Sequence, residues 1–367
     1  MFADRRAVPL LVDFGGGAVT VIRHTPVVNL TGRGEFRVPA AGPVDWSQLD
    51  LLPECVTLEW AGAARGLTTA LADRDIRYLY WDDAVGDVDL SGTRVTNVRL
   101  SGAGLRSVRL GGGTTSLMLR GWPPDLVVDA PEQGHRLSLT LFGGADDVTV
   151  PEGLRRVPTL WLTVDRSLSA AALADLTDLT DLRICFDQTP GTLTDLPELA
   201  RHRLRRLQID EAYDVDPGDL PELPLLECLE LCGTRRSTAR ALRERFKGTP
   251  VRVAVDGAKS DAWLAKYLDN PFRDWAEQSR VFGLAACKAY TRARTAVDAV
   301  AADDPRRLAL LEKAMRGLIA DLNKIEEEHG LIDTINREHA GEVFDELARR
   351  VGVPSELADE WFDDRAW

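Results

Sequence analysis

A short apolar alternation recurs along most of the chain and constrains its fold more than any other feature. In each copy, an apolar residue is followed by two variable positions, a second apolar residue, one variable position and a third apolar residue. The second apolar positions of successive copies are roughly 19 to 25 residues apart, a spacing typical of repeat proteins. The full template occurs at 76–81, 95–100, 157–162, 179–184, 204–209 and 226–231, and weaker copies occur at 56–58, 117–119, 139–141 and 251–255.

The alternation within each copy has a period of two, which predicts a strand with every second side chain buried. We expect each strand to pair with its copy in the next repeat. The segments between copies carry short strands at 88–90, 108–110, 126–128 and 148–150, and later helices at 168–176 and 237–246. A short helix is also expected at 66–72. The pattern therefore predicts an α/β fold, a right-handed solenoid over residues 51–256 with a parallel sheet on its concave side.

Through this LxxLxL core, the chain resembles the leucine-rich-repeat family, in particular its bacterial members. The resemblance covers about 200 residues, which is most of the repeat region. It implies a solenoid that works by binding another macromolecule. The chain lacks the asparagine that usually follows the strand in this family, because the equivalent positions hold Ala84, Asp187, Ala212 and Thr234.

Two further domains are expected on either side of the repeats. Residues 1–50 contain strand-like runs at 9–12, 18–22 and 35–38, and an open solenoid end needs a cover, so we predict an N-terminal β cap. Residues 259–367 are expected to form a helical bundle with helices at 271–301, 305–329, 333–350 and 355–365. Three roles stay open for this bundle: sealing the solenoid, forming a homodimer, or carrying an activity of its own.

Charge and cysteine content limit the class of partner and the compartment. The net charge of −13 argues against binding nucleic acid or an anionic membrane, because both need dense Lys and Arg. Five scattered cysteines with no CxxC pair favour a reducing cytoplasm. No signal-peptide core and no run of 18 apolar residues is found. We therefore expect a cytoplasmic chain whose partner is a protein or peptide.

One outward-facing column on the predicted sheet is rich in the residue types of binding hot spots. The residue between the last two apolar positions of each copy gives Thr57, Tyr80, Arg99, Met118, Thr140, Trp161, Arg183, Gln208, Glu230 and Ala254. Flanking positions add Tyr78, Asp82, Asn97, Arg120, Asp181 and, if the register holds, Phe142. As the binding surface we predict Tyr78, Tyr80, Asp82, Arg99, Met118, Arg120, Trp161, Arg183, Gln208 and Glu230.

An enzyme with an active or metal site in the helical domain is the alternative hypothesis, with the repeats recruiting its substrate. Glu326 and His329 lie three apart on one expected helix, and His339 and Glu342 repeat that spacing on the next. Such pairs on facing helices build carboxylate metal sites in bundles. However, His329 is next to a helix-ending glycine, and the four carboxylates of a di-metal site are not evident. We therefore predict a binding protein with no catalytic residues, metal or cofactor.

Overall fold

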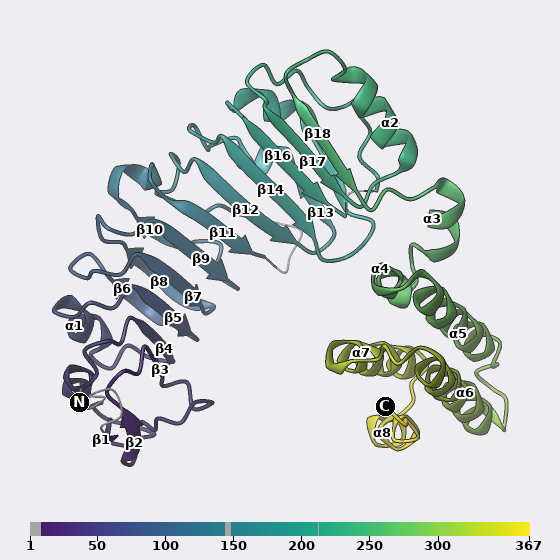
Figure 1. Cartoon of the computed structure of the whole chain (residues 1–367), viewed down its shortest axis with the longest axis horizontal. Coiled ribbons are helices and arrows are strands. Elements are labelled where there is room, and N and C mark those ends of the chain that lie inside the picture. The colour runs from purple at the N-terminus through teal and green to yellow at the C-terminus, as the bar shows by residue number, and fades with distance from the viewer. Residues whose placement is uncertain (1–8, 144–147, 212) are drawn as a thin grey trace, which may run out of the picture. The chain divides into compact units, whose positions relative to one another are not determined.

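The computed structural model describes residues 9–143, 148–211 and 213–367. The chain divides into two compact units, Met1–Lys259 and Ser260–Trp367 (Figure 1). The first unit is α/β and contains a large parallel sheet, and the second consists of helices.

The main sheet of the first unit has eleven strands, and every neighbouring pair is parallel. Its strands follow one another across the sheet in chain order, so each new strand is added at the same edge (Figure 1). The strands are β3 (Val27–Asn29), β4 (Thr57–Ala61), β5 (Tyr78–Asp82), β7 (Asn97–Ser101), β9 (Ser116–Arg120), β11 (Ser138–Phe142), β12 (Thr159–Val164), β14 (Asp181–Phe186), β16 (Arg206–Asp210), β17 (Cys228–Cys232) and β18 (Arg252–Asp256).

The register places equivalent positions of the repeat next to one another. Leu79 pairs with Val98, and Trp81 pairs with Leu100, on the adjacent strands β5 and β7. These side chains are all buried, because successive residues of a strand point to opposite faces and the repeat makes every second one apolar. The apolar alternation therefore becomes two continuous buried rows, and the predicted parallel pairing of the repeats is confirmed.

Smaller elements pack against the same core between the strands of the main sheet. A three-stranded parallel sheet joins β6 (Val85–Asp89), β8 (Gly104–Arg109) and β10 (Val127–Asp129), and a two-stranded one joins β13 (Ser167–Ser169) and β15 (Thr192–Thr194). The helices of this unit are α1 (Leu67–Ala72) and α2 (Arg236–Arg245). The 3-10 helices in the described part of this unit are Trp46–Leu51, Pro131–Gly134, Ala170–Leu173 and Leu196–Arg201.

Two connecting segments differ from the sequence-based expectation. The helix predicted at 168–176 is wrong: the segment begins as β13 and continues as the 3-10 helix Ala170–Leu173, whose first turn is capped by the Ser169 hydroxyl. The strand predicted at 148–150 is absent. There the Trp122 indole donates to the Thr149 carbonyl, while the Val128 amide of β10 donates to Glu152 instead.

The N-terminal region combines an antiparallel hairpin with the first strand of the main sheet. The hairpin joins β1 (Pro9–Val12) to β2 (Val19–Ile22), and β3 pairs with β4. Residues 1–8 of the predicted cap lie outside the described residues. The strand expected at 35–38 is not formed, and the Arg37 guanidinium donates there to the carbonyls of Gly34 and Phe36.

The second unit contains α3 (Asp261–Tyr267), α4 (Trp275–Gln278), α5 (Arg280–Asp298), α6 (Arg307–His329), α7 (Thr334–Arg350) and α8 (Ser355–Phe362). The single helix predicted at 271–301 is wrong, because Ser279 has an extended backbone that separates α4 from α5. Phe282 of α5 then stacks on Trp275 of α4, with ring centroids 5.0 Å apart. Within the described ranges, no helix is both long enough and apolar enough to cross a membrane.

Candidate functional site

The side chains of the main sheet that point away from the two buried rows make up one face, here called the outer face. It consists of three rows that alternate with the two buried rows. The middle of these three, the central row, crosses the sheet at Asn29, Glu59, Tyr80, Arg99, Met118, Thr140, Trp161, Arg183, Gln208, Glu230 and Ala254.

The sequence-based column is wrong at its first position. Glu59, and not Thr57, pairs with Tyr80, whereas Thr57 pairs with Tyr78 in the first row. The second and third apolar positions of this copy are Leu58 and Trp60, so the residue between them is Glu59. Trp60 pairs with Trp81 and is buried like it, so the tryptophan itself was the signal that could have given the correct register.

The structure places the ten predicted binding residues on the outer face. Tyr78 lies in the first row, and Asp82 and Arg120 lie in the third, flanking the central row. Phe142 pairs with Arg120, so the register on which its inclusion depended is confirmed. The central row holds the other seven, Tyr80, Arg99, Met118, Trp161, Arg183, Gln208 and Glu230.

Aromatic rings and guanidinium groups pair across neighbouring strands of this face. The Arg99 guanidinium lies over the Tyr80 ring at 4.4 Å from its centroid, and Arg183 lies over Trp161 at 4.2 Å. In both cases the two residues are direct partners in the strand register. A cation over an aromatic face is attracted by the ring quadrupole, so the stacking restricts the motion of both side chains.

A buried carboxylate anchors the second of these pairs. Asp210 Oδ2 accepts hydrogen bonds from Arg183 Nη2 at 2.8 Å and from Nε at 3.1 Å. Gln208 Nε2 donates to Asp210 Oδ1 at 3.0 Å. Asp210 is only 6 % exposed, whereas Trp161 is 38 % exposed. The network therefore holds an accessible indole and a guanidinium in one fixed arrangement. Sequence reasoning missed Asp210, although it occupies the same row as Asp82.

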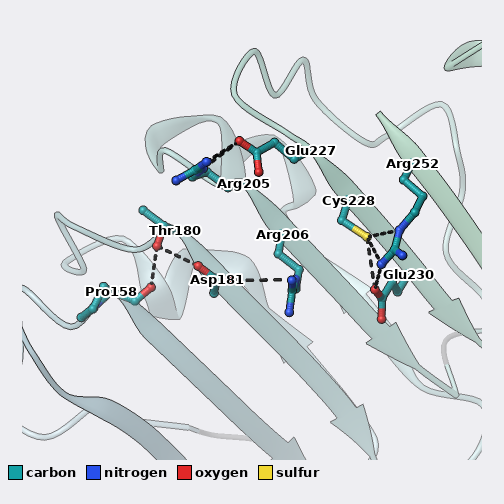
Figure 2. A network of polar contacts seen from close by, with 9 residues as sticks. All are labelled: Pro158, Thr180, Asp181, Arg205, Arg206, Glu227, Cys228, Glu230 and Arg252. Atoms are coloured by element: carbon teal, nitrogen blue, oxygen red, sulfur yellow. Dashed lines mark hydrogen bonds and ion pairs between the residues drawn. The ribbon is translucent and has the colours of Figure 1, made fainter. Parts of the chain in front are cut away.

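Charges at the C-terminal end of the outer face are largely paired (Figure 2). Arg252 Nη2 donates to Glu230 Oε1 at 2.9 Å and to the Cys228 sulfur at 3.2 Å. Asp181 lies 3.9 Å from Arg206 on the next strand. Arginines therefore alternate with carboxylates across the strands, and this part of the face is mixed in charge rather than basic.

The Asp210 carboxylate also suppresses the reactivity of a nearby thiol. Burial, together with the negative charge of Asp210 and its hydrogen bond with the thiol, raises the pKa of Cys232 to about 11. The pKa of Cys185 is raised as well, first by burial and then by Asp210 and Asp187. Both thiols are therefore held protonated at neutral pH, and the thiolate is the reactive form.

This environment predicts slow alkylation of Cys232. At pH 8 we expect iodoacetamide to modify it about 100-fold more slowly than an unperturbed cysteine, because so little thiolate is present. The Asp210→Asn variant removes the carboxylate charge and should accelerate the reaction several-fold, while Asp82→Asn, at the equivalent position of β5, should not. Residue-specific mass spectrometry across pH 7 to 10 measures these rates; equal rates in the two variants would contradict the assigned cause.

Three of the four candidate metal ligands of the helical unit, Glu326, His329 and His339, are engaged in other contacts. Glu326 Oε2 accepts the Ile332 amide at 2.7 Å and so caps the turn between α6 and α7. His339 Nδ1 accepts from the Trp275 indole at 3.1 Å, and burial lowers the pKa of this histidine. His329 packs edge-on against Phe282. Within the described part of the chain, no three His, Cys, Asp or Glu side chains, Glu342 included, are grouped to hold a metal ion.

Comparison with known proteins gives no relative: no family model, no curated protein and no solved structure matches the chain.

Proposed function

We propose that the first unit is a right-handed, leucine-rich-repeat-like solenoid whose concave side is the outer face. Three observations support this proposal. The strands are parallel and follow chain order, the repeat positions align in register, and the connections return through short strands and 3-10 helices on the other side of the core. Each turn buries its apolar positions against the next, which is how solenoids obtain their stability.

We further propose that this face binds a protein or peptide. The observation that carries the proposal is the Trp161, Arg183 and Asp210 network at the middle of the sheet. A half-exposed indole is kept in place by a stacked guanidinium, which a buried carboxylate holds in turn. Tryptophan, tyrosine and arginine dominate binding hot spots, and a preformed arrangement lowers the entropy lost on association.

The charge of the outer face favours a protein over a nucleic acid. Binding to phosphates requires unpaired cations along the surface. Here Arg183 is paired with Asp210, Arg252 with Glu230, and Arg99 lies 3.9 Å from Asp82. A face with both signs of charge and several aromatic rings matches the central part of a protein interface.

The triple variant Y80A/W161A/R183A tests this function. Peptides would be selected from a random library against the wild-type chain, and their binding measured by calorimetry. We expect the triple variant to bind them about 100-fold more weakly or worse, since two or more hot-spot side chains are lost. The matched control V85A/R106A/V127A truncates exposed residues of the three-stranded sheet and should bind normally. Peptides that bind the triple variant as tightly as the wild type would refute the proposed face.

A further inference from the structure

A groove of about 880 Å³ crosses the surface of the helical unit between α3, α5 and α6. Its floor is apolar, formed by Val281 and Leu284 of α5, Ile325 of α6 and Tyr267 of α3. Val281 is 67 % exposed although its side chain is entirely apolar. The outer face of the main sheet contributes nothing to this groove, so it is a separate surface.

The length of the groove matches a short helix. The lining residues of α5 extend from Arg280 to Arg292 and recur on successive turns of one helix face. At 1.5 Å per residue this wall is about 18 Å long, or somewhat more than three helical turns. Amphipathic helices bind in such grooves through apolar residues at positions i, i+3, i+4 and i+7.

One wall of the groove is cationic. Lys266, Arg280 and Lys288 are exposed along the α3 and α5 side, and among the described residues no ion pair is formed by Arg280 or Lys288. The α6 side is mixed, because Arg292 pairs with Asp321 at 2.8 Å and Lys324 lies 3.9 Å from Glu328. This gathering of cations is unusual in residues 260–367, which contain more Asp and Glu than Lys and Arg.

We propose that this groove binds an amphipathic helix of a partner protein, with its apolar stripe on the floor and carboxylates along one flank. The carboxylates face Lys266, Arg280 and Lys288. The charge complementarity is local, because the net charge of −13 repels anionic surfaces from the rest of the molecule. An anionic bilayer, which is wide and flat, would meet that repulsion, whereas a single helix contacts only the groove.

A synthetic peptide tests the proposal on the full chain. The probe is a fluorescein-labelled helix of about 15 residues with leucines at i, i+3, i+4 and i+7 and glutamates along one flank. Its fluorescence anisotropy should show saturable binding to the wild type. The variant R280E/K288E should bind it about tenfold more weakly or worse, because two attractive charges become repulsive. Both positions are exposed and form no ion pair with any described residue, so circular dichroism should show an unchanged fold.

The matched control K313E/R337E carries the same change of charge outside the groove and should bind the peptide like the wild type. The Y80A/W161A/R183A variant should also bind it normally, so failure of this proposal is distinguishable from failure of the sheet-face proposal. Absence of saturable binding, equal affinity for a peptide with lysines on the flank, or equal losses in both charge variants would overturn it. Binding of phosphatidylglycerol vesicles in place of the peptide would also overturn the proposal, because the ligand of the groove would then be a lipid surface.

Discussion

Replacing Trp81 with alanine is expected to lower the free energy of unfolding of the first unit by about 3–5 kcal/mol, whereas Tyr80→Ala should cost about 1 kcal/mol or less. The two residues are neighbours on β5, but they point to opposite sides of the sheet. Trp81 is fully buried, and its indole nitrogen donates to the Gly62 carbonyl at 2.7 Å. Tyr80 lies on the outer face against Arg99.

The cost of the Trp81 variant has two parts. Truncation removes a large side chain from the core and leaves a cavity, and it also leaves the Gly62 carbonyl without this donor. Urea denaturation followed by circular dichroism measures both variants, and the transition of the helical unit should not move. Equal losses of unfolding free energy in the two variants would contradict the assignment of Tyr80 and Trp81 to opposite faces of the sheet. The assignment of residues to the outer face would then be wrong as well.

The sequence was sufficient to predict the main sheet because one pattern specifies both its strands and their register. Leucine or another apolar residue at every second position selects the buried face, and the recurrence at each repeat brings equivalent positions together. Met118 and Gln208 could therefore be placed in one row although they are far apart in the chain. The prediction is wrong at Thr57, because the second and third apolar positions of that copy are Leu58 and Trp60, which place Glu59 in the central row.

The contacts within the candidate site could not be predicted in the same way. The pattern indicates that Arg183 and Asp210 point outward, but not that Asp210 becomes buried beneath the guanidinium. That burial depends on side-chain packing across three strands. The groove of the helical unit is even harder to predict, because it depends on how α3, α5 and α6 pack against one another. Helical periodicity predicts which face of each helix is buried, but not which other helix that face contacts.

The break between α4 and α5 shows the same limit, because helix propensity favours a continuous helix there. Gly283 allows the two helices to approach so closely that a Cβ at this position would lie 2.1 Å from the Ala276 nitrogen and 2.4 Å from its Cα. Those are backbone atoms, which cannot move aside as the end of a flexible side chain can. The close approach also brings Phe282 onto Trp275.

We therefore expect Gly283→Ala to destabilise the helical unit by about 3 kcal/mol or more, the upper range for overpacking a core. Gly317→Ala is the matched control, because it lies within α6 and an added Cβ would meet nothing within 4 Å. That variant should stabilise the unit by about 0.5–1 kcal/mol, the ordinary gain when alanine replaces glycine in a helix. Thermal unfolding of both variants shows whether each substitution raises or lowers the stability of the helical unit. Stabilisation by Gly283→Ala would show that propensity outweighs the contact, and the close packing of α4 on α5 would then be incorrect.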